Sequence, residues 1–357
     1  MSTDGMNYAP EAFTEKVVEK GEFVFAASHF DHGHIYGQLN MLTKAGGTLK
    51  WVYSEDPAKL DAIKDHIDAG TKIATRFEDI LEDPEVQLVT SAAIPNRRAE
   101  IGFQVMDSGK DYFTDKSPFT TLEQLEQAKV KIKETGRKYM VSYSERLMSE
   151  SAWHAGELIK DGAIGRVLQI LNLAPHNLAA SSRPEWFFDK EAYGGIITDI
   201  GSHQFEQFLE YSGAADGEVL SARVENFANP ETPGLEDFGE ANLQLSTGAS
   251  AYCRMDWFNP AKSRTWGDGR TFILGDKGYM ELRKYINVCE DNGGNKIFLV
   301  NNDTEQMIDC ADRVGFPFFG RLILDCLNRT EKAMTQEHAL KAAELSMLAQ
   351  KAADARH

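Results

Sequence analysis

Lysine, aspartate and histidine side chains in two short segments have the types and spacing needed for acid–base chemistry on a hydroxyl group. Lys116 lies in an Asp-Lys-Ser-Pro sequence, and Asp199 and His203 are four residues apart. A lysine can hydrogen-bond a hydroxyl and stabilise charge on its oxygen, while an imidazole can take up the proton near neutral pH. Residues i and i+4 of a helix share a face, so the carboxylate can orient the histidine. Without such a function, Lys116 would be a surface lysine in a turn and His203 a core histidine with satisfied hydrogen bonds.

A second polar stretch follows the first buried apolar run, at 23–27. A dinucleotide-binding fold carries its glycine-rich turn here, because glycines let the backbone approach the pyrophosphate. Ser28, Phe30 and Gly33 occupy the three glycine positions, so only the third glycine is present. A helix that starts near Gly33 would still offer N–H groups to a phosphate. We therefore expect a turn after Ala27 in which Ser28 and Phe30 contact a cofactor.

Three histidines in the same stretch allow two interpretations. His29, His32 and His34 are residue types that bind metal ions. However, the chain shows no carboxylate and histidine arrangement elsewhere that completes a ligand set, and side chains at these spacings need not converge. We therefore predict no metal site, and we expect His29 and His32 to contact the cofactor.

The end of the next expected strand, at 49–53, bears on the choice of cofactor. Ser54 stands where NAD-binding domains usually place an acidic residue that holds the ribose hydroxyls. Glu55 and Asp56 follow it, and no arginine lies beside it to hold a 2′-phosphate. Both NAD and NADP remain open at this point.

The first part of the chain alternates short apolar runs with helix-like segments, which indicates strands joined by helices. The runs lie at 23–27, 49–53, 86–90, 112–114 and 139–143. Such alternation is typical of right-handed βαβ units and a parallel sheet. Ligands of parallel sheets bind at the carboxyl ends of the strands, so the residues just after these runs are candidates for a site.

After residue 143 the order changes. A helix at 149–160 is followed by strand-like runs with short turns, interrupted by a helix at 199–211. We predict an N-terminal arm (1–20), a Rossmann-type parallel-sheet domain (21–143), and an α+β domain with a large open, mostly antiparallel sheet (144–357). Thr335 is placed to cap a C-terminal helix that can pack back on the first domain.

Composition restricts the possible partners. The 357 residues are 42% hydrophobic and carry a net charge of −17, so a folded protein is expected and nucleic acid or an anionic membrane surface is an unfavourable partner. The four cysteines form no metal-binding pattern, and they are expected to be buried or inert. We expect no membrane span and a cytoplasmic location, because no apolar run is long enough and no signal pattern opens the chain.

Two segments resemble motifs of the Gfo/Idh/MocA oxidoreductase family, which includes glucose–fructose oxidoreductase and inositol dehydrogenase. The residues at 115–118 are similar to the family's E-K-P motif, and the ten residues from Gly194 match its G-G-x-x-x-D-x-G-x-H motif. The second motif is quite specific. The expected order of domains also resembles the family from about residue 21.

The resemblance implies a mechanism and a set of contacts. Lys116 would bind and polarise the reacting hydroxyl, His203 would be the general base in oxidation or the acid in reduction, and Asp199 would position His203 and the substrate. A hydride would pass between a substrate C–H and C4 of the nicotinamide. Further contacts to NAD or NADP are implied for Ala93, Pro95, Asn96 and Asp115.

The sequence departs from the family pattern at the cofactor site. Ser28 and Phe30 replace glycines, Ser54 replaces the ribose-binding acid, and Asp115 replaces glutamate before the lysine. The segment 94–99 lacks the threonine and histidine of the family's T-P-N-x-x-H motif.

Three residues near the expected cleft are candidates for substrate contacts. Arg146 leaves the first domain, His176 follows a strand, and Trp186 lies in the loop before the glycines. Arginine and histidine can hydrogen-bond hydroxyls. An indole ring can stack on the C–H face of a pyranose, or it can pack beneath the loop as part of the core.

We therefore expect an NAD(P)-dependent oxidoreductase that transfers a hydride to or from a hydroxyl or keto carbon of a sugar, polyol or related compound. One alternative is a hydrolase or lyase on a glycoside that uses nicotinamide transiently, and net cofactor turnover separates the two. Another is a non-catalytic binding protein that has lost the cofactor. Because the open sheet leaves one face uncovered, we expect a homodimer or homotetramer through that sheet.

Overall fold

The computed structural model describes residues 5–64, 67–290 and 293–355, which form two compact units. The parallel-sheet unit comprises Met6–Ser142 and Phe316–Ala339. The open-sheet unit comprises residue 5, Tyr143–Gly315 and 340–355. The expected division after residue 143 differs from this division by one residue. The segment Phe316–Ala339, which was expected in the second domain, lies in the parallel-sheet unit.

The parallel-sheet unit has a six-stranded sheet in the order β3-β2-β1-β4-β5-β6, with all pairs parallel. Its strands are β1 (Val24–Phe30), β2 (Thr48–Tyr53), β3 (Lys72–Ile73), β4 (Leu88–Ala92), β5 (Asp111–Asp115) and β6 (Tyr139–Ser142). The prediction of a Rossmann-type parallel sheet is confirmed. The order reverses between β1 and β4, and such a switch point is where α/β sheets bind ligands.

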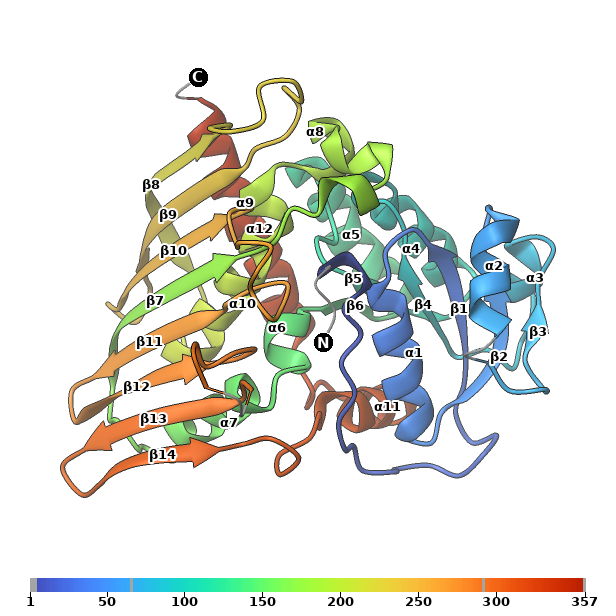
Figure 1. The fold of residues 1–357 in the computed structure, drawn as a ribbon. Coiled ribbons are helices and arrows are strands. Elements are labelled where there is room, and N and C mark those ends of the chain that lie inside the picture. The colour runs from blue at the N-terminus through green and yellow to red at the C-terminus, as the bar shows by residue number, and fades with distance from the viewer. Residues whose placement is uncertain (1–4, 65–66, 291–292, 356–357) are drawn as a thin grey trace. The chain divides into compact units, whose positions relative to one another are not determined.

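Helices connect these strands (Figure 1). The connecting helices are α1 (His34–Lys44), α2 (Pro57–Ile63), α3 (Glu78–Leu81), η3 (Pro95–Arg97), α4 (Arg98–Asp107) and α5 (Leu122–Thr135). The short η1 (Gly5–Asn7) precedes β1, and α11 (Phe318–Asn328) comes from the later segment of this unit. The clearest local signals surround α5, where Thr121 and Gln124 form a capping box. Gly136 ends the helix in the left-handed conformation, with φ of 63°.

The prediction of a turn directly after Ala27 is wrong. β1 continues to Phe30, so Ser28, His29 and Phe30 belong to the strand and the chain turns at Asp31. The register with β4 shifts between Ser28 and Phe30, and His29 has a φ of 57°. A bulge with one residue in the left-handed region accounts for the shift. Sequence periodicity gave no sign of it, because the glycine that usually adopts such a φ is missing.

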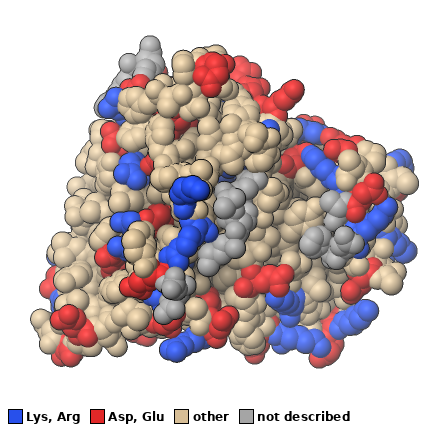
Figure 2. Space-filling model, viewed as in Figure 1, with Lys and Arg blue, Asp and Glu red and all other residues tan. Residues whose placement is uncertain are grey.

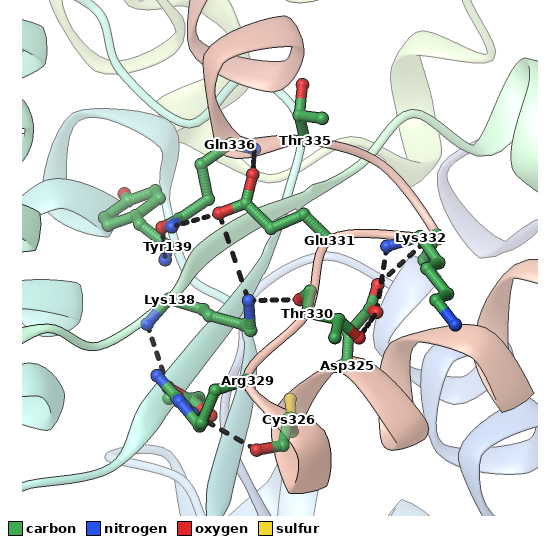
Figure 3. A network of polar contacts seen from close by, with 12 residues as sticks. Lys138, Tyr139, Asp325, Cys326, Arg329, Thr330, Glu331, Lys332, Thr335 and Gln336 are labelled. Carbon is green, nitrogen blue, oxygen red and sulfur yellow. Dashed lines mark hydrogen bonds and ion pairs between the residues drawn. The ribbon is translucent and has the colours of Figure 1, made fainter.

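Polar contacts fix the segment Phe316–Ala339 to the ends of β5 and β6 (Figure 3). The Lys138 ammonium donates to the carbonyl of Thr330 at 2.6 Å, and the Arg329 guanidinium pairs with Asp111 at 2.5 Å. The buried Asp325 carboxylate accepts N–H bonds from the backbone of Lys332 and Ala333 at 2.9 and 2.7 Å. The contacts of Lys138 with Thr330 and of Asp111 with Arg329 join residues that are far apart in the sequence. Local sequence patterns therefore could not assign this segment to the parallel-sheet unit.

The open-sheet unit has an eight-stranded sheet in the order β14-β13-β12-β11-β7-β10-β9-β8. Its strands are β7 (Val167–Pro175), β8 (Gly217–Glu225), β9 (Phe238–Leu245), β10 (Ser250–Asp256), β11 (Arg270–Gly275), β12 (Gly278–Arg283), β13 (Lys296–Asn301) and β14 (Glu305–Asp309). Only β7 and β10 pair in parallel among the described strands of this sheet. The prediction of a large, mostly antiparallel open sheet is confirmed.

Helices of the open-sheet unit pack on its strands. The helical segments are α6 (Ser144–Leu147), α7 (Glu150–Lys160), η4 (Ala180–Ser182), η5 (Glu185–Phe188), α8 (Lys190–Tyr193), α9 (Ile196–Asp199), α10 (Gly201–Ser212) and α12 (Gln336–Asp354). The predicted helix at 199–211 is in fact two helices that meet at Ile200. The Thr335 hydroxyl accepts from the N–H of His338 at 3.1 Å, so the predicted cap is confirmed. From residue 340 onward, α12 belongs to the open-sheet unit rather than to the first.

Surface charge and helix hydrophobicity bear on the kinds of partner that the described part of the chain can bind. Acidic and basic side chains are interspersed over the face shown in Figure 2. Across residues 5–64, 67–290 and 293–355, none of the helices combines the length and the apolar character that crossing a bilayer requires.

Candidate functional site

The carboxyl ends of β1 and β5 bring a cluster of charged side chains together in the parallel-sheet unit. The His34 Nδ1 lies 3.1 Å from Oδ1 of Asp115, and the His32 Nδ1 lies 3.7 Å from Oδ2. Arg98, at the start of α4, places its Nη2 3.5 Å from the same Oδ2. These four residues form the Asp115 cluster. The sequence predicted His32 and Asp115 as cofactor contacts, but their direct proximity follows from the sheet.

The cluster keeps a fully buried carboxylate ionised. Burial by itself raises the pKa of Asp115, but His34, Arg98 and His32 outweigh it and hold the pKa well below its ordinary value. Burial and the nearby His34 lower the pKa of His32 well below its usual range, so that imidazole is neutral at working pH. A permanent negative charge therefore lies beside a neutral ring.

A ligand set of two histidines and one carboxylate is present in this cluster. Atoms of His32, His34 and Asp115 that can bind a metal all lie within 4.8 Å of one another. The sequence did not predict this convergence. Arg98 already contacts the carboxylate, and the charges of Lys116 and Arg98 both act on His32. Two cations this close oppose a divalent ion, so we assign the cluster no metal.

Lys116 follows the cluster at the end of β5. Its side chain is only 6% exposed, which does not fit a surface lysine in a turn. The Arg98 guanidinium donates to the carbonyl oxygens of Lys116 and Ser117, the latter at 3.1 Å. The backbone that carries Lys116 is therefore held by the same arginine that contacts Asp115.

A cleft of about 310 Å³ opens beside the ends of β1 and β2, and it suits an adenosine moiety. The His29 ring meets Tyr53 and Phe77 edge-on, at centroid distances of 5.5 and 5.0 Å. Arg97 of η3 makes a bidentate pair with Glu55 at 2.7 Å for both contacts. All five residues line the cleft.

Unpartnered polar atoms at the end of β1 indicate that this part of the fold can accept a ligand. Ser28 Oγ and His29 Nδ1 are buried and have no hydrogen-bond partner among the described residues. Buried polar groups normally have a partner, so such atoms point to a missing one. Together with the aromatic cleft, they fit the nucleotide part of a nicotinamide cofactor.

Four other predicted cofactor contacts do not line this cleft. Ser54 is buried, and its Oγ accepts from the N–H of Asp56 at 3.2 Å. The carbonyl of Ala93 accepts from Arg98 at 2.7 Å, and that of Asn96 accepts from Gln124 at 2.8 Å. Pro95 opens η3. Sequence reasoning concentrated on Ser54 and gave no role to Glu55 and Arg97, which are 42 residues apart.

The one glycine retained in the loop has a local reason. A Cβ at Gly33 would lie 2.6 Å from the carbonyl oxygen of Met6 and 2.7 Å from Oδ1 of Asn7. Any larger residue would therefore push the N-terminal segment away from the start of α1. Close packing of two parts of the chain is sufficient to require glycine here.

The second predicted motif lies in the open-sheet unit and is buried. Gly194 and Gly195 both have positive φ, at 89° and 91°, which explains the glycine pair. A Cβ at Gly195 would also lie 2.3 Å from the side chain of Gln350. Asp199 ends α9 and His203 lies in the first turn of α10, both nearly inaccessible to solvent.

Two of the three predicted substrate residues have contacts that bear on that role. Arg146 is buried, and its Nε donates to the Glu206 carboxylate at 2.7 and 2.9 Å. This buried ion pair indicates a structural role for Arg146, and its contact to a substrate stays a prediction. The His176 ring packs on Trp266 and Trp257, with centroids 4.6 and 5.4 Å away.

Trp186 lies in η5 and is half-buried, with its ring 6.0 Å from that of Phe187. It therefore contributes to an aromatic group beneath the loop. Sequence reasoning missed Glu145 and Lys284, which are buried and hydrogen-bonded to each other in the open-sheet unit. Their separation of 139 residues left no local signal.

Comparison with known proteins identifies the family. The profile of the GFO/IDH/MocA C-terminal domain matches residues 153–281. A crystal structure of a protein from Erwinia carotovora atroseptica SCRI1043, described as an oxidoreductase, is 42% identical with a TM-score of 0.90, covering 93% of this chain and 99% of that chain. The chain belongs to the Gfo/Idh/MocA oxidoreductase family.

More distant members of the Gfo/Idh/MocA family have named activities. D-xylose dehydrogenase of Paenarthrobacter nicotinovorans is 29% identical over 136 residues, which are 36% of this chain and 34% of that protein. The chain thus matches about a third of the length of that curated relative. A structure of levoglucosan dehydrogenase in complex with NADH and levoglucosan is 14% identical, with a TM-score of 0.76 over 94% of this chain and 98% of that chain. At this identity the likeness shows the fold alone.

Burial of His29 predicts a loss of stability in mild acid. Burial, the dominant cause, lowers the pKa of His29 from 6.5 to about 4. The unfolded chain therefore binds a proton that the folded chain rejects, and stability falls as pH drops below the unfolded value. Between about pH 7 and about pH 5 the free energy of unfolding should fall by about 2 kcal/mol from this residue.

Urea unfolding of the wild type and of His29→Phe at the two pH values measures this effect. The variant should lose less stability on acidification than the wild type. His154→Gln is the control and should keep the full dependence, because His154 is partly exposed. Equal pH dependence in wild type and His29→Phe would show that the burial of His29 has no such effect.

Proposed function

We propose that this chain is a nicotinamide-dependent oxidoreductase that transfers a hydride to or from a hydroxyl or keto carbon of a sugar or polyol. The observation that carries the proposal is the burial of Lys116 and His203, which hold the positions of the family's lysine and histidine. Burial of an amine and an imidazole costs free energy, and here both buried groups lie at the positions that the family motifs assign to the reaction. Family membership and the names of distant relatives support the same reading.

In this proposal the chain's own residues bind the substrate and move one proton. The Lys116 ammonium hydrogen-bonds the reacting oxygen and stabilises negative charge on it. The His203 imidazole takes the hydroxyl proton during oxidation and returns it during reduction. Asp199 supplies a carboxylate that positions His203 and the substrate. A nicotinamide, when bound, would accept or supply the hydride at its C4.

Cofactor binding is assigned to the parallel-sheet unit. Ser28 and His29 offer unpartnered polar atoms, and Tyr53 and Phe77 form an aromatic wall. Asp115 lies directly before Lys116, where the family resemblance implies a contact to the cofactor.

Measurement of turnover tests the function. Purified protein is supplied with NAD⁺ or NADP⁺ and a panel of aldoses, glycosides and polyols, and the nicotinamide absorbance is followed. Lys116→Met and His203→Asn should each lower kcat by about 10²- to 10⁴-fold, because each removes a proton-handling or charge-stabilising group. Lys110→Met is a matched control, since Lys110 is also buried but donates to the carbonyl of Leu81.

Other outcomes would identify a different function. Cleavage of a glycoside without net change in the nicotinamide would identify the protein as a hydrolase or lyase. A protein that binds none of the four nicotinamide nucleotides would be a binding protein, and the oxidoreductase proposal would fail.

We further propose that the cofactor is NAD rather than NADP. Arg97 lines the cleft but is bound to Glu55, and its guanidinium lowers the pKa of that carboxyl. A 2′-phosphate would have to displace an ionised carboxylate from its partner. A ribose 2′-hydroxyl could instead hydrogen-bond the carboxylate.

Replacement of Glu55 tests the choice of cofactor. Glu55→Gln should shift the ratio of NADP to NAD affinity toward NADP by about tenfold, because it frees Arg97 for the phosphate. Calorimetric titration with each nucleotide measures the ratio. Glu85→Gln is the control, since it removes an exposed partner of Lys50. Tighter binding of NADP than NAD by the wild type would contradict the proposal.

We also propose that the open sheet mediates a homodimer or homotetramer. Several large apolar side chains are exposed on its strands, namely Leu220, Leu274, Tyr279 and Met307. Leu274 and Tyr279 line a hollow of about 190 Å³. A second copy presents the same apolar surface, which a two-fold axis can match to itself.

Light scattering tests the assembly. The wild type should have the mass of two or four chains, and Leu274→Asp should reduce the mass toward that of one chain. Val130→Asp is the control, because Val130 is an exposed apolar residue of the parallel-sheet unit. A wild type with the mass of a single chain would overturn the proposal.

A further inference from the structure

A buried ion pair lies beside the helix that carries His203. The Lys284 ammonium donates to Oε2 of Glu145 at 2.8 Å. Both residues are only 3% exposed, although they are 139 residues apart in the chain. Lys284 follows β12 and Glu145 lies in α6, so the pair joins the sheet to a helix of the same unit. Buried pairs of this kind add little stability and call for another explanation.

Both partners of the ion pair also hold α10. Gln204, the neighbour of His203, donates from its Nε2 to Oε2 of Glu145 at 2.9 Å. Lys284 donates to Oε1 of Gln207 at 3.1 Å. Gln207 in turn donates from its Nε2 to the carbonyl of His203 at 3.0 Å. The helix is thus tied to the pair at two positions that follow His203 within about one turn, and both glutamines are fully buried.

Glu145 and Lys284 also place one negative and one positive charge in the surroundings of His203. Burial raises the pKa of Glu145, but Lys284, His203 and His176 outweigh it and lower the pKa to about 2. Glu145 is therefore an anion at any working pH. Its Oε1 has no hydrogen-bond partner in the described part of the chain, and it lies 3.8 Å from Nε2 of His176.

We propose that Glu145 and Lys284 are positioning residues that fix His203 and set its affinity for a proton. The proposal rests on the proposed function, in which His203 exchanges a proton with the substrate. The anion favours the protonated imidazole that forms during alcohol oxidation. The cation limits this effect, so that the proton can leave again. Removing either partner should therefore move the affinity of His203 for its proton, and in opposite directions.

Other charged groups near α10 are compensated by their own partners. α10 packs against α6, α7, α9, β7, β9 and β10. On these elements Arg146 is paired with Glu206, Lys160 with Glu210, and Arg254 with Asp256. Further titratable groups on or beside these elements are Tyr143, whose ring centroid lies 6.4 Å from that of His203, together with Asp199, His176, Glu150, Glu240, Tyr252, Cys253 and the pair of His154 with Glu157. The two predicted shifts come from substitutions at Glu145 and Lys284 alone, with these other groups unchanged.

NMR titration of the histidine rings in the full-length protein tests the proposal. The His203 signal is assigned by its loss in His203→Asn. In Glu145→Gln the pKa of His203 should fall by about one unit, and in Lys284→Met it should rise by a similar amount. If the enzyme is active, the rising limb of the pH profile for oxidation should move to lower pH in Glu145→Gln and to higher pH in Lys284→Met.

Conservative and matched variants complete the test. Lys284→Arg keeps the charge and should leave the pKa of His203 close to that of the wild type. Lys296→Met removes another buried lysine of the same sheet, paired with Asp309, and should also leave it unchanged. Should Glu145→Gln not fold, the upward shift in Lys284→Met and its rescue by arginine decide the matter.

A His203 pKa that is the same in wild type, Glu145→Gln and Lys284→Met would overturn the proposal. Equal shifts in the same direction for the two variants would also overturn it, because they would report a general loosening of α10. The NMR result does not require turnover, so failure of the proposed function would be seen separately as an absence of activity in the wild type.

Discussion

A carboxylate in a protein interior is stable only where cations or N–H groups replace the water that it has lost. Asp115 is compensated by Arg98 and two histidines, and Glu145 by Lys284 and Gln204. Asp115 directly precedes Lys116 and Gln204 directly follows His203, the two residues to which we assign the chemistry in our proposal. The need to compensate buried charge therefore determines where the candidate site can be built in each unit.

Buried carboxylates also serve purely structural purposes in this chain. Glu150 accepts N–H bonds from the backbone of Asp312, Val314 and Gly315, at 2.7 to 3.1 Å. Asp325 does the same for the segment that follows α11. These groups satisfy backbone donors in loops, whereas Asp115 and Glu145 face side chains that can exchange protons. The kind of hydrogen-bond partner, backbone N–H or ionisable side chain, therefore distinguishes the structural carboxylates from those near the proposed reactive groups.

The cofactor side of the parallel-sheet unit has replaced glycine with a bulged strand. In the usual fingerprint, small residues let the backbone approach the pyrophosphate. Here His29 adopts a positive φ without being glycine and turns its ring toward Tyr53 and Phe77. The aromatic group thus includes His29, a residue of the bulged strand itself. Such a backbone conformation is costly for a side chain other than glycine, and it persists where the surrounding packing enforces it.

Much of the fold followed from local pattern. Alternating strands and helices indicated the parallel sheet, and a succession of strands indicated the open one. The caps at Thr121 and Thr335 fix helix starts by hydrogen bonds within one turn, so a sequence can reveal them. The strand β3, with only Lys72 and Ile73, escaped notice because two exposed residues show no apolar run.

The sequence by itself determined the order of elements, the family motifs and the identities of Lys116, Asp199 and His203, because each depends on residues close together in the chain. Tertiary structure alone decided which of the three histidines at 29–34 meet Asp115 and which lysine pairs with Glu145. Those contacts join residues 81 and 139 positions apart, in His34 with Asp115 and in Glu145 with Lys284. Side-chain convergence over such separations depends on strand order and register, which local periodicity does not encode.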